Sequence, residues 1–249
     1  MSVPRRRHSQ PEDIHRNQHL DLLNFIDYCK LEWNSKRHIN SKLRSIRNFY
    51  EYLKETNPNT INPATNLYLK GAIHKLPTNI IDYRELEKLY VNYQTATNRD
   101  KRNKIILGLL IYQGLTTGEL QQLKAENLKL KQGKIFVPGN LKRNSRTLEL
   151  KPFQILELYE YVNEIKPNVL KEISKPKPAR KPNIINKEKL KEQLFISNGS
   201  GNIKNSLLHM FRKIRKVNPE ILHPKQIRAS AIVYRLKHFN LRQVQYFAG

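Results

Sequence analysis

Apolar residues recur every three or four positions along most of the chain, a spacing typical of amphipathic α-helices. A run over residues 20–30 predicts one helix, and a longer run over 36–55 predicts a second. One face of the second run carries five apolar residues: Ile39, Leu43, Ile46, Tyr50 and Leu53. Asn57 and Pro58 then end the helical pattern. We therefore predict a small all-helical domain at residues 11–73.

A second domain is predicted at residues 80–249, after a linker at 74–79 that lies in a stretch punctuated by glycine and proline. Asp82 is placed to cap a helix, and residues 105–112 are apolar on nearly every side, which predicts a buried helix. The same period predicts four further helices, at 152–167, 203–216, 226–238 and 241–248.

Two short runs of alternating character, 134–137 and 147–150, flank a segment that contains Gly139 and three basic residues. This pattern predicts a β-hairpin with a basic tip. The expected fold class is mainly α with a small β-sheet or hairpin, in which an all-helical N-terminal domain precedes a mixed α+β domain.

Two segments are basic and lack a helical period. Residues 1–10 include three consecutive arginines and predict an extended basic arm. Residues 168–191 are rich in lysine, arginine and proline, and we expect a mobile basic insertion outside the core.

The charge balance indicates a polyanionic partner, because 46 Lys and Arg residues stand against 21 Asp and Glu residues, a net charge of +25. The single Cys29 excludes a disulfide scaffold within the chain and a thiolate metal cluster. No apolar run is long enough for a membrane span, and residues 1–10 lack the apolar core of a signal peptide. We expect a soluble cytoplasmic protein, associated with the nucleoid, with no membrane partner.

Motifs for nucleotide cofactors and metals are missing from the sequence. It contains no Walker A loop, no dinucleotide fingerprint, no HExxH and no His or Cys cluster at zinc spacing. We therefore expect no small-molecule cofactor and no metal site.

Three segments resemble the boxes of the tyrosine recombinase (phage integrase) family, and they occur in the family's order. Residues 114–120, Gly-Leu-Thr-Thr-Gly-Glu-Leu, are similar to the Gly-Leu-Arg-x-x-Glu-Leu box. The basic hairpin up to Leu148 resembles the strand pair that carries the family's catalytic lysine. Residues 225–228 resemble the His/Lys-x-x-Arg box, and 240–249 resemble the segment that leads to a Gly-His or Gly-Trp pair.

The resemblance implies covalent catalysis on DNA. A tyrosine attacks a phosphodiester and holds the strand as a phosphotyrosine until a 5′ hydroxyl displaces it, while cations stabilise the phosphoryl oxygens. Arg228 is the expected phosphate ligand and Lys225 a second donor. Lys142 is expected to protonate the leaving 5′ oxygen, with Arg143 and Lys134 as open alternatives. An equally open alternative is that all three only contact phosphate. The alternative for Arg228 is a surface arginine on its helix.

The sequence departs from the family pattern in two places. Thr116 stands where the family has its first arginine, and it forms a capping box with Glu119. The family's His or Trp and its tyrosine would follow Gly249, so we expect the 249-residue chain to be inactive as printed. Tyr246 shares the apolar register of Val244 and is predicted to lie in the core.

The resemblance also implies that the N-terminal helical domain is a SAM-like core-binding domain and that active protein assembles as a tetramer on two double-stranded DNA sites. Six residues are candidate DNA contacts, on the 36–55 helix and the hairpin: Lys36, Arg37, Arg44, Arg47, Arg143 and Arg146. Lys70, His74 and Lys75 of the linker region add positive charge to the expected clamp. A non-catalytic DNA-binding remnant or accessory protein is the alternative, and a basic RNA-binding protein is disfavoured because no RNP-like aromatic strand is present.

Overall fold

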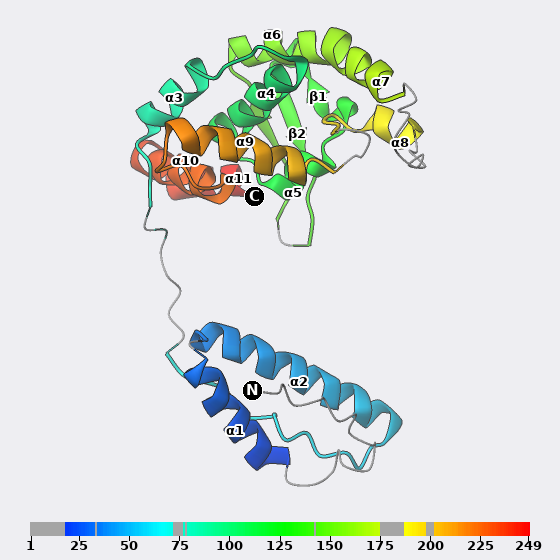
Figure 1. Cartoon of the computed structure of the whole chain (residues 1–249), viewed down its shortest axis with the longest axis vertical. Helices are drawn as coiled ribbons and strands as arrows, with labels where there is room; N and C mark the ends of the chain where they lie inside the picture. The colour runs from blue at the N-terminus through cyan, green and yellow to red at the C-terminus, as the bar shows by residue number, and fades with distance from the viewer. Residues whose placement is uncertain are drawn as a thin grey trace, which may run out of the picture. The chain divides into compact units, whose positions relative to one another are not determined.

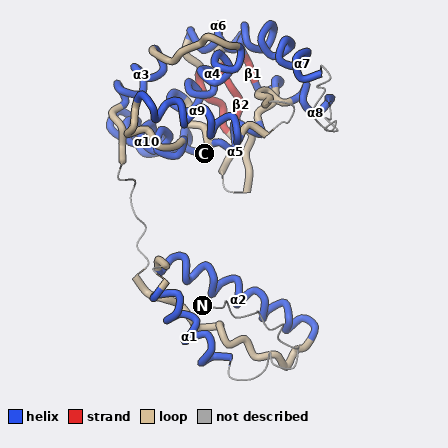
Figure 2. Tube along the Cα trace, viewed as in Figure 1, coloured by secondary structure: helices blue, strands red, loops and turns tan. Residues whose placement is uncertain are grey.

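The computed structural model divides into two compact units, Met1–Leu76 and Pro77–Gly249, and each is described by itself (Figure 1). The structure describes residues 18–32, 34–71, 77, 79–141, 143–174, 187–197 and 202–249. The division between the units falls inside the segment expected to be a linker. Helices dominate both units, and the strands lie in the second (Figure 2).

The first unit pairs α1 (Gln18–Leu31) with α2 (Lys36–Thr56), as the apolar spacing predicted. Ser35 caps α2 by accepting a hydrogen bond from the backbone N–H of His38. A small buried cluster joins the two helices, with Leu67 and Leu69 of the following segment packed against it: Ile26, Cys29, Ile39 and Leu43.

Polar side chains of α2 hold the segment that follows the helix. The Asn40 amide donates to the carbonyl of Leu69 at 3.0 Å and accepts from its N–H at 2.9 Å. Arg47 donates to the carbonyls of Ala64 and Leu67, both at 3.2 Å. These bonds satisfy backbone groups that the small core alone leaves unpaired.

The second unit is built around α4 (Asn98–Tyr112), which the sequence predicted as a buried helix. Its residues 105–112 are buried on every side, and α4 packs against α3 (Tyr83–Val91), α6 (Pro152–Glu160), α9 (Lys204–Val217) and α10 (Pro224–His238). Asp82 caps α3, as predicted, by accepting from the N–H of Arg84 at 2.8 Å. The remaining α-helices of the described residues are α5 (Thr117–Gln122), α7 (Lys166–Ser174), α8 (Lys187–Glu192) and α11 (Leu241–Ala248). Two 3-10 helices, Ala125–Asn127 and Leu130–Gln132, precede and follow β1.

The sheet has three antiparallel strands in the order β1-β2-β3, which are β1 (Leu128–Lys129), β2 (Lys134–Val137) and β3 (Arg146–Glu149). The predicted hairpin is confirmed as β2 and β3, with Val137 opposite Arg146. The two-residue strand β1 was not predicted, because so short a segment shows no alternating pattern.

The helix expected to end near Pro167 continues instead. A π-helical segment, Tyr161–Ile165, joins α6 to α7, and Pro167 lies in the first turn of α7. Proline lacks the N–H that would close the preceding α-helical bond, and a π-helical turn accommodates the defect. The pattern-based boundary at this proline was therefore wrong.

The ends of the predicted basic insertion, 168–191, belong to the fold. They lie in α7 and α8, and both Val169 and Leu190 are buried in the main core. Residues 175–186 lie outside the described part. In the described part of the chain, no helix has the length and apolar character needed to span a bilayer.

Candidate active site

Arg228 lies one turn into α10, on a helix whose start is well defined. Pro224 is the first helical residue, and the imidazole Nδ1 of His223 caps the helix by accepting from the N–H of Gln226 at 3.1 Å. His223 is thus the N-cap of α10. Ile227 and Ala231 are buried and fix the helix in the core, which holds Arg228 in place.

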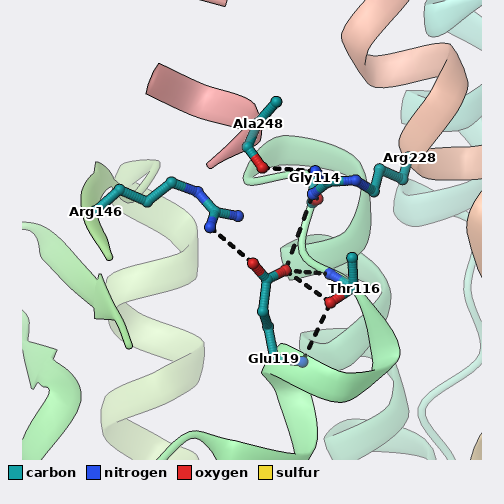
Figure 3. Close-up of polar contacts among 6 residues, drawn as sticks. All are labelled: Gly114, Thr116, Glu119, Arg146, Arg228 and Ala248. Atoms are coloured by element: carbon teal, nitrogen blue, oxygen red, sulfur yellow. Dashed lines mark hydrogen bonds and ion pairs between the residues drawn. The ribbon is translucent and has the colours of Figure 1, made fainter. Parts of the chain in front are cut away.

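The Arg228 guanidinium joins two segments far apart in the sequence (Figure 3). Its Nη1 donates to the carbonyl of Gly114, and its Nη2 donates to the carbonyl of Ala248 at 2.6 Å. The side chain is only 12% exposed. Two of the segments that resemble recombinase boxes therefore meet the end of α11 at this one arginine.

Burial lowers the pKa of Arg228 to about 10, with the charges of Arg143 and Arg146 acting in the same direction. The nearby Glu119 carboxylate opposes that shift. The guanidinium is still positively charged at neutral pH.

Thr116 and Glu119 form the capping box that the sequence predicted at the start of α5. The Thr116 hydroxyl accepts from the Glu119 N–H at 3.2 Å, and the Glu119 Oε2 accepts from the Thr116 N–H at 2.7 Å. The Thr116 hydroxyl also donates to Oε2 at 2.8 Å. Thr116, which we expected in place of the family's first arginine, thus binds a carboxylate through both its N–H and its hydroxyl.

Arg146, expected as a DNA contact of the hairpin tip, has a different position. It is buried at the start of β3, and its Nη1 donates to Glu119 Oε1 at 2.7 Å, with side chains 1% and 0% exposed. Glu119 also lies 3.9 Å from Arg228 Nη1. Among the described residues, the Nε and Nη2 of Arg146 have no hydrogen-bond partner.

Glu119 carries the negative charge of this centre. Its burial raises the pKa of the carboxyl, but hydrogen bonds from Arg146 and Thr116 outweigh this effect and lower the pKa below its usual 4.5. Figure 3 shows Arg146 and Arg228 reaching the carboxylate from different elements, β3 and α10. We call Thr116, Glu119, Arg146 and Arg228 together the arginine centre.

The end of α11 closes over the arginine centre. The Phe247 ring lies against Gly114, where an added Cβ would come within 2.7 Å of it, and Gly114 has a positive φ of 58°. The Arg235 guanidinium lies 3.8 Å from the centroid of the same ring and donates to the carbonyl of Tyr112 at 3.1 Å. Gly114 thus permits a contact that a larger residue would block.

Tyr246 is not in the core, so that expectation was wrong. Val244 and Phe247 are buried, but Tyr246 is 56% exposed. Its hydroxyl accepts from the N–H of Thr147 at 3.0 Å and donates to the carbonyl of Thr147 at 3.4 Å. Because β3 is an edge strand, this side chain satisfies backbone groups that no neighbouring strand pairs.

The other predicted catalytic residues are less closely tied to the centre. Lys225 is exposed on the first turn of α10, and Lys134 is exposed on β2. Arg143 is half-buried in the β2–β3 connection and near enough to influence Arg228. Lys142 lies outside the described residues.

The predicted DNA contacts on α2 differ among themselves. Lys36, Arg37 and Arg44 are exposed, whereas Arg47 is half-buried and bonded to the segment after the helix. Of the linker residues, Lys70 is exposed, and His74 and Lys75 lie outside the described residues.

The sequence did not predict that Glu119 would pair with Arg146 and Arg228, nor that Arg235 would contact Phe247 and Tyr112. The capping-box spacing located Glu119, but nothing local indicated that two arginines from later in the chain would meet it. Within the residues that the structure describes, no group of three or more His, Cys, Asp and Glu side chains is arranged to hold a metal ion.

Comparisons with known proteins agree with the boxes. Residues 79–249 match the model of the Phage integrase family. The tyrosine recombinase XerD of Listeria innocua is 26% identical over 161 residues, which is 65% of this chain and 52% of that protein. The tyrosine recombinase XerC of Staphylococcus aureus is 25% identical over 122 residues, 49% of this chain and 41% of that protein. The chain thus spans about half the length of the curated relatives it matches.

Two solved structures share the fold. The XerH site-specific recombinase bound to a palindromic difH substrate has a TM-score of 0.67 and 19% identity, covering 92% of this chain and 62% of that one. The Tn1549 transposon integrase in complex with circular intermediate DNA has a TM-score of 0.59 and 17% identity, covering 93% and 77%. With the family match extending over most of the chain, this protein belongs to the phage integrase family.

Proposed function

We propose that this protein is a site-specific DNA recombinase or integrase that cuts and rejoins strands through a phosphotyrosine intermediate, in DNA integration or transposition. The observation that carries the proposal is that the Arg228 guanidinium binds the carbonyls of both Gly114 and Ala248, so that three segments of the chain meet at one side chain. Family membership and the DNA-bound XerH and Tn1549 integrase structures support it.

In the proposed reaction, a tyrosine oxygen forms a bond to the scissile phosphorus and the 5′ oxygen leaves. Arg228 stabilises the charge on the non-bridging oxygens, for which it is suited because a guanidinium presents five N–H donors and only two bind carbonyls here. Lys225 is the proposed second donor. Lys142 is the proposed acid that protonates the 5′ oxygen, with Arg143 and Lys134 as alternatives.

We propose that Tyr246 is not the nucleophile. Its hydroxyl is bonded to both backbone groups of Thr147, whereas a nucleophile must be free to approach phosphorus. A duplex with a nick next to the cleavage site traps covalent adducts. We expect no adduct with a polypeptide of residues 1–249; an adduct mapped to Tyr246 would overturn this assignment.

We further propose that residues 11–73 form a core-binding domain that clamps double-stranded DNA, with residues 1–10 as a basic arm and 74–79 as the linker. Lys36, Arg37 and Arg44 are exposed and suited to phosphate contacts. Assembly as a tetramer on two DNA sites and association with the nucleoid belong to the same proposal. Size-exclusion chromatography with light scattering, on DNA-bound protein, tests the tetramer.

Duplex binding tests the proposed partner directly. Affinity should fall steeply between low and moderate salt, because each neutralised phosphate releases about one counterion. Fluorescence anisotropy over a series of salt concentrations measures the slope. A flat response would contradict the proposed clamp.

A further inference from the structure

The arginine centre contains a buried carboxylate close to the arginine proposed to bind phosphate. Glu119 is fully buried, and Arg228 Nη1 lies 3.9 Å from its Oε2. A carboxylate so near attracts a guanidinium and competes with any phosphate for it. Arg228 can bind phosphate well only if other groups pair with the Glu119 carboxylate and leave the Arg228 guanidinium accessible.

Arg146 and Thr116 together occupy both oxygens of that carboxylate. Arg146 binds Oε1 at 2.7 Å, and the N–H and hydroxyl of Thr116 bind Oε2 at 2.7 and 2.8 Å. Arg228 instead donates its hydrogen bonds to the carbonyls of Gly114 and Ala248, which carry no net charge. Its positive charge is thus left largely uncompensated, although a carboxylate is nearby.

We propose that Arg146 is a positioning residue that neutralises Glu119 and thereby keeps the charge of Arg228 available to a DNA phosphate. Thr116, in the place of the family's first arginine, supports this arrangement by holding the second carboxylate oxygen. The inference rests on the proposed function, because it assigns Arg228 to phosphate.

Direct contact between Arg146 and phosphate is disfavoured by its surroundings. The side chain is 1% exposed. Gly249 covers it so closely that an added Cβ there would lie 2.5 Å from Nη1 and 3.1 Å from Cζ. Arg146 therefore acts on phosphate through Glu119, and its effect should disappear when Glu119 carries no charge.

Inorganic phosphate is the probe, and the Nε–H signal of Arg228 is the readout, in protein labelled with ¹⁵N-arginine. The Arg228→Lys variant assigns the signal. We expect Arg146→Met to weaken phosphate binding about tenfold, since Arg228 then turns to the unpaired Glu119. Glu119→Gln should strengthen binding a few-fold, because it removes a negative charge near Arg228.

The double variant Arg146→Met with Glu119→Gln decides the question. We expect its phosphate affinity to return to within about threefold of the wild type, since both partners of the buried pair are then neutral. A double variant as weak as Arg146→Met would overturn the inference, because the loss would then not pass through Glu119. Weakening by Glu119→Gln to the same extent as by Arg146→Met would also overturn it.

Folding is monitored separately by thermal unfolding of each variant. If Arg146→Met does not fold, two other expectations carry the test: Glu119→Gln should still strengthen phosphate binding, and the conservative Arg146→Lys should keep near wild-type affinity. Failure of the proposed function would give a different result: the variants would show the expected order of phosphate affinities, and yet the wild-type protein would not bind duplex DNA.

Discussion

Two regions of this protein, the face of α2 and the arginine centre, are both rich in basic residues but differ in solvent exposure and in the partners of their charges. On α2, Lys36, Arg37 and Arg44 are exposed to solvent, where a charge contributes little to the stability of the fold and is accessible to a polyanion. In the centre, Arg146 is buried and Arg228 is half-buried beside Glu119, and both are held by defined partners. Positive charge alone therefore does not reveal whether a residue binds DNA or supports the fold.

Arg47 and Arg146 make the difference concrete. Both stand among basic residues, and both were expected to contact DNA. In the structure, Arg47 binds the carbonyls of Ala64 and Leu67, and Arg146 binds Glu119. Each is used within its own unit, so substitutions should separate folding effects from DNA-binding effects.

The largest expected effect on stability comes from breaking the buried pair. Glu119→Ala leaves Arg146 charged and buried without its carboxylate, which should lower the free energy of unfolding by about 3–5 kcal/mol. Urea denaturation measures it. The matched control is Glu85→Ala, which breaks an exposed pair with Lys88 and should cost at most about 1 kcal/mol. Equal losses would remove the distinction between the regions.

Acid provides an independent check on the same pair. Because folding lowers the pKa of Glu119 below 4.5, its contribution to stability is present above that pH. The contribution is lost as the pH falls through the lowered pKa. Glu119→Gln should therefore show a weaker loss of stability on acidification than the wild type, measured by unfolding at several pH values.

The next largest effect is catalytic. Under the proposed function, Arg228→Ala should reduce strand cleavage about 10²–10³-fold, which is the usual effect of losing one donor to a charged transition state. Binding to duplex should weaken little. Cleavage of the nicked substrate measures the rate, with the exposed Arg212→Ala on α9 as a control. Rapid cleavage by Arg228→Ala would exclude it from the reacting centre.

A smaller, paired effect separates Arg47 from Arg44 on the same helix. Arg47→Ala should destabilise the first unit by about 1–2 kcal/mol, because it removes two bonds to backbone carbonyls. Arg44→Ala should leave stability nearly unchanged and reduce the log–log salt slope of DNA binding by about one. Denaturation and anisotropy measure the two effects; the reverse assignment would refute the comparison.

The smallest effect is expected at the edge strand. Tyr246→Phe removes the hydroxyl that binds both backbone groups of Thr147, at an exposed position, and should cost about 0.5 kcal/mol. Tyr159→Phe on α6, also exposed, serves as the control. Faster amide exchange of Thr147 in Tyr246→Phe alone would locate the effect, and unchanged exchange would count against it.

Local features of this protein were predictable from the chain. The apolar period located α2, α4 and α11, the Thr116–Glu119 spacing located a capping box, and alternation located β2 and β3. Each depends on residues within a few positions of one another. The continuation at Pro167 was missed because a proline usually ends a helix, and here a π-helical segment accommodates it. Strand β1 was missed because two residues show no alternating pattern.

The amino-acid sequence by itself determined the helical framework, the strong positive charge and the boxes that place the chain in the phage integrase family. Only the tertiary structure decided that Arg146 is a buried counter-ion, that Tyr246 binds the edge of β3, and that Arg228 joins Gly114 to Ala248. The physical reason is that the function of a long polar side chain depends on which groups the folded chain brings next to it. Those groups lie up to 114 positions away along the chain.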